Sequence, residues 1–229
     1  LCIHPSWSLT LEIAFYLSLP LLGLLMFALR RRLNVAPLKL ALVAPAILLV
    51  VAYIGRALTP WVYEHVNVHN FTPDGGTYMP DIWLQNWGPN LAAVFRRSIL
   101  TNADLFAFGM LAAILFVAIE QAVIGERAAK WIHRAAILGI PVFGVLTLKL
   151  VKDLSPFGYG VLGIVSALFI MMVILPLAWG APSRLARWID ARPFYFVGLI
   201  SMSVYLWHYP LLLLLGRFNL VAGDTWGGM

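Results

Sequence analysis

Charged side chains are scarce in this sequence, where Asp, Glu, Lys and Arg together make up only 11% of the 229 residues. Soluble domains carry about a quarter charged residues. Hydrophobic residues reach 62%, and the mean hydropathy is +0.87. A soluble core of this size has no room for so much apolar surface. The composition therefore excludes a soluble domain and predicts that the solvent is largely lipid.

Cysteine is almost absent, because Cys2 is the only one, and this excludes an internal disulfide. The sequence also lacks a Walker loop, a dinucleotide fingerprint, a G-x-S-x-G elbow and a CxxC pair. His65 and His69 have the spacing of metal ligands, but Glu64 precedes the first histidine, unlike the glutamate of the H-E-x-x-H motif. We therefore expect no metal and no bound cofactor.

Long apolar stretches dominate what is present, and six of them approach the ~20 residues that cross a bilayer as a helix. They are Leu9–Leu29, Leu38–Leu58, Ala103–Ile119, Ala135–Leu150, Phe157–Trp179 and Phe194–Leu215. Proline occurs inside most of them, which membrane helices tolerate when neighbours satisfy the freed carbonyls. The sequence predicts an all-α, polytopic membrane helix bundle with about six transmembrane helices.

The basic residues behind the net charge of +6 are unevenly distributed. Ten of the 16 lie in three alternate connections, which are Arg30–Lys39, Glu120–Arg134 and Gly180–Pro193. The positive-inside rule places these connections in the cytoplasm, and we expect no nucleic-acid partner. The long connection Thr59–Thr101 is then an extracytoplasmic loop. Its tryptophans and tyrosines belong to the membrane interface or stack on sugar rings.

Glu12 lies about one turn inside the outer end of the first predicted span. An ionisable side chain there is costly, so it usually faces a polar cavity and has a function. Ser8, Glu12 and Tyr16 follow helical spacing and share one face. The alternative is an interfacial glutamate that reaches water near the helix end.

His208 lies in the outer half of the last predicted span, on the same side of the membrane as Glu12. Ser201, Tyr205 and His208 are spaced i, i+4 and i+7, which makes one polar stripe. Pro210 leaves the carbonyl of Leu206 without its helical donor. A carboxylate and an imidazole at similar depth can act as a general base and its orienting partner. The alternative is a histidine hydrogen-bonded between helices or anchored in the aromatic belt.

Asp104 begins the third predicted span on this side. It is a candidate substrate-binding residue, but it also fits a first helical turn that Asn102 would cap. Arg96 and Arg97 precede it and could attract an anionic donor or a lipid phosphate, or form a solvated pair at the interface.

Two segments resemble signatures of the membrane-bound acyltransferase family 3, the O-acyltransferases of surface glycans. Trp7, Ser8, Leu9, Glu12, Phe15 and Tyr16 match its W-[ST]-L-x-x-E-x-x-F-Y pattern. The segment from Gly198 to Pro210 is similar to its G-x-[IL]-S-x-x-x-Y-L-x-H-x-P pattern. A third segment, Ala107–Ala112, is similar to a family helix containing F-x-x-G-M-L-x-A. One position departs from the pattern, because Ile13 stands where many members carry a second glutamate.

The resemblance implies transfer of an acyl group, which we expect to be acetyl from acetyl-CoA, to a hydroxyl of a glycan or lipid-linked sugar. It implies Glu12 and His208 as catalytic residues. The expected substrate-binding residues are Trp7, Ser8, Tyr16, Ser201, Tyr205, Trp207 and Asp104. We expect a bacterial inner or plasma membrane, with the bilayer, the acyl donor and the acceptor as partners.

The family is expected to have about ten spans. Residues 1–229 therefore resemble a partial acyltransferase-3-like transmembrane domain, a fragment without the early helices and the last helix. We do not expect this fragment to be active on its own. Two alternatives stay open, a proton-coupled transporter and an inactive truncated remnant.

The orientation can be tested by cysteine labelling. After Cys2→Ser, a cysteine placed within Thr72–Met79 should react with an impermeant thiol reagent added outside, because the positive-inside rule leaves this loop extracytoplasmic. A cysteine placed within Gln121–Gly125 should react only after permeabilisation. The reverse pattern would invert the assigned topology.

Overall fold

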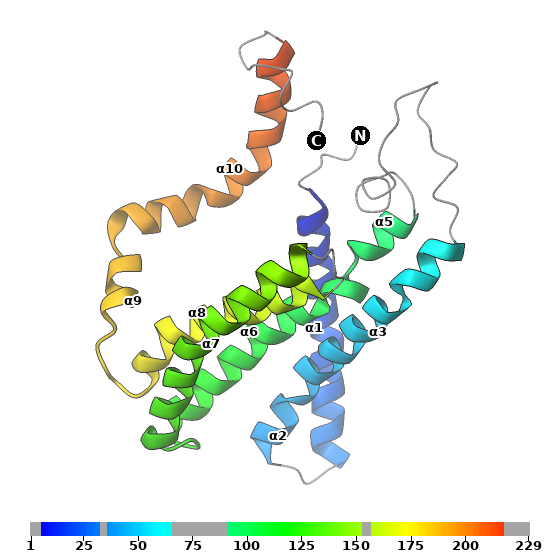
Figure 1. The fold of residues 1–229 in the computed structure, drawn as a ribbon. Coiled ribbons are helices and arrows are strands. Elements are labelled where there is room, and N and C mark those ends of the chain that lie inside the picture. The colour runs from blue at the N-terminus through cyan, green and yellow to red at the C-terminus, as the bar shows by residue number, and fades with distance from the viewer. Residues whose placement is uncertain (1–5, 33–35, 66–90, 153–156, 218–229) are drawn as a thin grey trace. The chain divides into compact units, whose positions relative to one another are not determined.

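The computed structural model describes residues 6–32, 36–65, 91–152 and 157–217, and all its regular elements over these ranges are helices. Figure 1 shows the helices in chain order. They are α1 (Ser6–Arg32), α2 (Pro37–Ala41), α3 (Val43–His65), α5 (Leu91–Arg96), α6 (Ile99–Glu120), α7 (Glu126–Lys152), α8 (Gly158–Ala178), α9 (Arg184–Ile189) and α10 (Arg192–Arg217).

Five stretches of the described chain are long and apolar enough to cross a membrane. They are Ser8–Arg32, Pro37–His65, Leu91–Glu120, Glu126–Lys152 and Gly158–Ala178. The sixth predicted span falls within α10. In lipid every backbone N–H and C=O group needs a partner inside its own segment, and the helix supplies one. The predicted all-α, multi-pass membrane fold is confirmed.

The helices divide into two compact units, one of residues 1–12 with 184–229 and the other of residues 13–183. In the larger unit α3 packs on α6, α6 packs on α8, and α8 packs on α7. Its first core cluster consists largely of small side chains, with Ala52 of α3 facing Ala103 and Ala107 of α6. Small residues let membrane helices approach closely, so van der Waals contact replaces the hydrophobic drive that lipid cannot provide.

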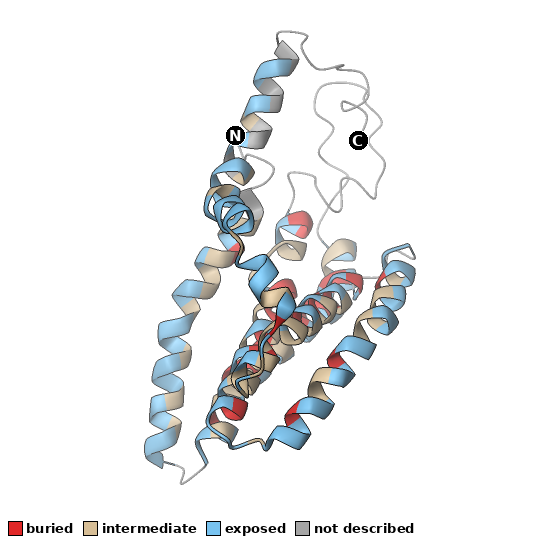
Figure 2. Cartoon of the chain, turned by 90° about the vertical axis from the view of Figure 1, so that its left-hand side faces the viewer, coloured by how far each residue is buried: buried red, intermediate tan, exposed pale blue. Residues whose placement is uncertain are grey.

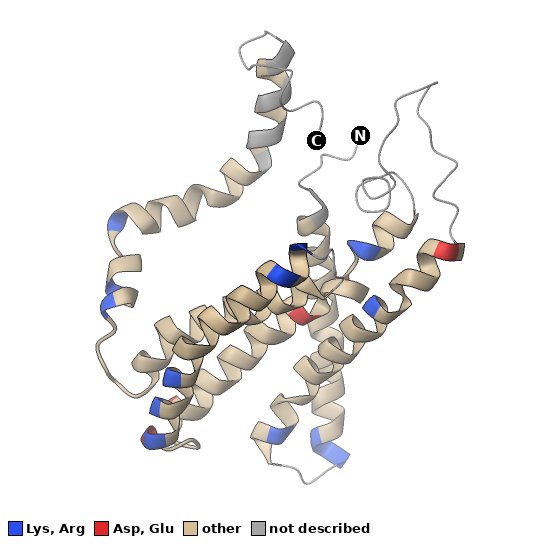
Figure 3. Ribbon diagram, in the orientation of Figure 1, with Lys and Arg blue, Asp and Glu red and all other residues tan. Residues whose placement is uncertain are grey.

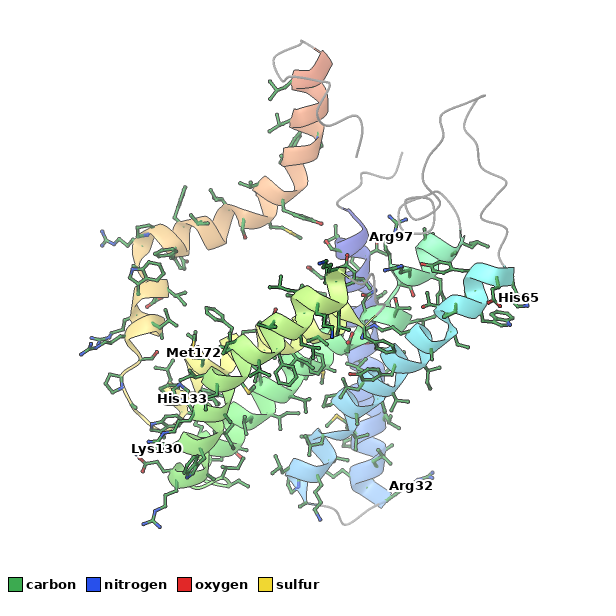
Figure 4. The ribbon with its side chains drawn as sticks, in the orientation of Figure 1. Arg32, His65, Arg97, Lys130, His133 and Met172 are labelled. Atoms are coloured by element: carbon green, nitrogen blue, oxygen red, sulfur yellow. The ribbon has the colours of Figure 1, made fainter. Side chains whose placement is uncertain are left out.

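A second cluster holds the other end of the same unit. Ile119, Ala129 and Leu175 come from α6, α7 and α8 and are buried together. His133 lies beside this cluster, and its Nε2 is 3.0 Å from the carbonyl oxygen of Met172. Figure 4 labels these two residues, one on α7 and one on α8. This histidine therefore serves as a contact between helices.

Large apolar side chains cover the outside of the helices. Leu21, Leu138 and Leu148 are all more than 65% exposed, and Figure 2 shows exposed residues along most of the helices, with fewer buried ones between them. Such a surface suits hydrocarbon and would be insoluble in water. Figure 3 shows Lys and Arg mostly at helix ends, with long uncharged stretches between them. The basic ends include Arg30, Arg31 and Arg32 of α1.

Two sequence expectations about boundaries are wrong. The connection predicted as the loop Thr59–Thr101 is shorter, because α3 continues to His65 and helix resumes in α5 and α6. Asn102 does not cap α6. Ser98 is the N-cap, and its hydroxyl accepts a hydrogen bond from the backbone N–H of Leu100. Helix α6 starts before the apolar stretch because the hydroxyl of its N-cap residue accepts a hydrogen bond from a backbone N–H of the first turn.

Gly55 marks the closest approach of α3 to the start of α6. A Cβ at this position would overlap the backbone carbonyl of Leu100, whereas a Cβ at Gly144 of α7 would meet nothing within 4 Å. Gly55→Ala should lower the stability by about 1–3 kcal/mol, because backbone must shift to admit the methyl group. Gly144→Ala should raise it by up to about 1 kcal/mol. Thermal unfolding in detergent measures both, and equal melting temperatures would contradict the packing of α3 on α6.

Candidate active site

The two helices that carry the candidate catalytic residues meet within the smaller unit. The hydroxyl oxygens of Ser8 and Tyr205 are 2.6 Å apart, and either one can be the donor. Ser8 belongs to the first turn of α1 and Tyr205 to the middle of α10, so 197 positions of sequence separate them. Both side chains are half-buried. This hydrogen bond joins the two segments that resemble the acyltransferase signatures.

Helical spacing relates the expected catalytic pair to this hydrogen bond. Glu12 follows Ser8 by four residues on α1 and is half-buried. Position 208 follows Tyr205 by three residues on α10. Residues three or four apart lie on one helix face, so each catalytic position shares a face with one of the bonded hydroxyls. The side chains of His208 and Trp7 lie outside the described part of the structure.

The other residues expected to bind substrate are more exposed. Trp207 is 64% exposed on α10 and Tyr16 is 62% exposed on α1. The hydroxyl of Ser201 donates to the carbonyl of Gly198, 2.7 Å away within the same helix. The predicted polar stripe of α10 thus contributes Tyr205 to the hydrogen bond with α1, while Ser201 bonds to its own backbone.

Asp104 occupies an environment that the sequence did not predict. Its carboxylate is fully buried, and both oxygens accept hydrogen bonds from Arg56 of α3. The distances are 2.6 Å from Nη1 to Oδ2 and 2.8 Å from Nη2 to Oδ1. The interpretation of Asp104 as an open first-turn acid is wrong. Direct binding of substrate by Asp104 remains a prediction and would require this ion pair to open.

Arg56 is the residue that sequence reasoning missed. It lies inside the predicted span Leu38–Leu58. Placing a charged side chain inside a membrane span costs free energy, for Arg56 as for Asp104. The presence of two opposite charges in consecutive predicted spans could have indicated an ion pair. Their pairing depends on how α3 and α6 rotate against one another, which only the packing decides.

Arg96 and Arg97 are half-buried at the end of α5. Nη1 of Arg96 donates to the hydroxyl of Tyr63, 3.2 Å away, and Nε of Arg97 donates to the carbonyl of Ala93 at 3.1 Å. Figure 4 labels Arg97 in this region. The interpretation of the two arginines as a fully solvated pair is wrong, because both side chains are held by the protein.

A metal centre is not formed in the described chain, where no three potential ligands cluster together. His65 is the last residue of α3, and its ring stacks on Trp61 with 4.5 Å between ring centroids. Its Nδ1 lies 2.9 Å from the carbonyl oxygen of Trp61. His69 lies outside the described residues.

The family of the protein follows from a comparison with known domain families. A family model described as an acyltransferase domain, that of the acyltransferase 3 family, matches residues 1–228. The chain belongs to the acyltransferase 3 family. It is a multi-pass membrane enzyme of the transferase class, and an acyl donor and an acceptor are its substrates. Neither a search of curated proteins nor one of solved structures found a match.

Membership of the acyltransferase 3 family favours the acyltransferase over the transporter alternative. The family resemblance predicted from the two signature segments is confirmed, and with it the enzyme class. The transporter alternative rested only on intramembrane ionisable residues and on helices interrupted by proline. Those features are common to many membrane proteins, whereas the family match spans nearly the whole chain.

The hydrogen bond between Ser8 and Tyr205 can be measured by a double-mutant cycle. Ser8→Ala, Tyr205→Phe and the double variant should show a coupling energy of about 0.5–1.5 kcal/mol in thermal unfolding. Other contacts of each hydroxyl cancel from the coupling energy, because each substitution loses them whether or not the other substitution is present. Additive effects would mean that the two hydroxyls do not bond and that α1 and α10 are not joined here.

Proposed function

We propose that this acyltransferase moves an acetyl group from acetyl-CoA on the cytoplasmic side to a hydroxyl of a glycan or lipid-linked sugar outside. One observation carries the proposal. The hydrogen bond between Ser8 and Tyr205 joins the helix that carries Glu12 to the helix that carries His208. In this proposal the contact brings the acid and the imidazole close together, and these two groups are the parts that proton removal from an alcohol needs.

The proposed reaction is a direct acyl transfer. The His208 imidazole removes the proton from the acceptor hydroxyl while the oxygen attacks the thioester carbonyl. The bond from the carbonyl carbon to sulfur breaks as the new ester bond forms. The proton then passes to the leaving thiolate, so the products are the acetyl ester and free CoA. The Glu12 carboxylate orients the imidazole and stabilises its charged form, as the acid does in a catalytic triad.

The remaining candidate residues other than Asp104 bind the acceptor in this proposal. The hydroxyls of Ser8 and Tyr205 hold the acceptor oxygen, and they can do so because each can both donate and accept a hydrogen bond. Aromatic rings provide apolar faces on which a sugar ring packs, and Trp7, Tyr16 and Trp207 are assigned this role. Ser201 provides a further hydroxyl one turn before Tyr205 on α10.

Glu12→Gln and His208→Ala test the catalytic assignment in the full-length protein. Each should lower acetylation of the surface glycan by about 100- to 10,000-fold, because general acid–base catalysis contributes this much. Membrane levels of the protein should not change. Glycan-bound acetyl is measured by mass spectrometry, with protein quantified by immunoblot.

The controls use residues of the same types at the exposed end of α3. Glu64→Gln and His65→Ala remove a carboxylate and an imidazole that lie there. Both controls should retain parental acetylation. Parental acetylation in Glu12→Gln and His208→Ala as well would refute the catalytic pair. Transfer of a longer acyl chain in place of acetyl would refute the donor assignment alone.

A further inference from the structure

The ion pair of Arg56 and Asp104 is the most deeply buried charged contact among the described residues. The two side chains are 2% and 0% exposed. They connect α3 to α6, the two helices whose small residues form the first core cluster. The guanidinium and carboxylate are bonded through two nitrogens and two oxygens, which fixes both distance and orientation.

Stability alone is a weak reason for such a pair. Removing two charges from water costs several kcal/mol per ion, and the attraction between them offsets this only if the remaining N–H groups are also satisfied. Within the described chain, Arg56 has hydrogen bonds to Asp104 only. Apolar side chains of similar volume often replace a buried ion pair without loss of stability. A charged pair within the membrane therefore indicates a role in function.

A third helix is shaped to fit this pair. A Cβ at Gly160, in the first turn of α8, would overlap Nη1 of Arg56 and lie 2.8 Å from Oδ2 of Asp104. Glycine is therefore required for the backbone of α8 to lie against the two charges. The ion pair thus sets the arrangement of α3, α6 and α8 at one point.

The face of α6 opposite Asp104 holds α1. Phe106 follows Asp104 by two residues, and its ring stacks on Phe15 of α1 with centroids 4.1 Å apart and planes 7° apart. Phe15 follows Glu12 by three residues in one continuous helix. Whatever fixes α6 therefore fixes Phe15, one turn after Glu12 in the same helix.

We propose that Arg56 and Asp104 are a positioning pair for acyl transfer, which holds α6 so that Phe106 seats Phe15 and thereby aligns the helix that carries Glu12. The pair does not touch substrate in this role. This inference rests on the proposed function for its effect on catalysis, while the seating of α1 on α6 can be measured without any activity.

The central test is the apolar double variant Arg56→Met with Asp104→Leu in the full-length protein. It should reach the membrane and melt as the parent does, because apolar replacement keeps the volume and removes the desolvation cost. Its kcat should fall by about 100-fold, the cost of a misplacement of about 1 Å, with KM nearly unchanged. Parental kcat would overturn the proposal. Failure to fold would also overturn it, by making the pair a structural requirement.

A second variant keeps both charges and displaces them. Gly160→Ala should lower kcat without a matching rise in KM, because the added methyl group pushes on the pair. Gly144→Ala is the matched control, since its methyl group meets nothing within 4 Å, and it should retain parental kcat. Equal kcat in these two alanine variants would contradict a positioning role.

Cross-linking separates this proposal from the proposed function. With Cys2 replaced by serine, Phe15→Cys and Phe106→Cys should be joined by a short bifunctional thiol reagent. The rate should fall in the Arg56→Met, Asp104→Leu background, and an unchanged rate would overturn the seating of α1. A parent that transfers no acetyl group would refute the proposed function, while the cross-linking result would still decide the positioning role.

Discussion

The lipid solvent is the constraint on which the rest of this structure depends. Backbone N–H and C=O groups cannot remain without partners in hydrocarbon, so each crossing segment is a helix. Lipid also removes the hydrophobic drive between helices, and close packing of small residues takes its place, as at Ala52, Ala103 and Ala107. In such an interior each polar side chain is costly, so the few that are present carry most of the information about function.

Two polar contacts between distant parts of the chain follow from this constraint. Arg56 and Asp104 satisfy one another between α3 and α6, and the hydroxyls of Ser8 and Tyr205 do the same between α1 and α10. The first contact is sealed from solvent, which suits a fixed element of the scaffold. The second is half-buried, which suits the place that the alcohol substrate of the proposed function must reach.

The acyl transfer across the membrane that we propose requires an arrangement of this kind. In this proposal the acyl donor and the acceptor approach from opposite sides, so the reacting groups have to lie within the helices and near the outer end. An alcohol is a weak nucleophile until a base removes its proton, and a base inside lipid needs a partner to keep its charged form stable. In the proposed function, the two signature segments supply the carboxylate of Glu12 and the imidazole of His208 from α1 and α10.

Sequence alone determined the helical class, the crossing segments and the family. Apolar length and the arrangement of basic residues follow from the bilayer itself, and the two signature segments are local patterns. Tertiary structure decided which of the polar and charged residues inside the membrane spans contact one another. Arg56 was not singled out, and Asp104 was interpreted as a helix-start acid, because pairing depends on the rotation and offset of α3 against α6. Likewise the N-cap of α6 is Ser98 and not Asn102. Both residue types can cap a helix, and the backbone geometry decides which of them does so.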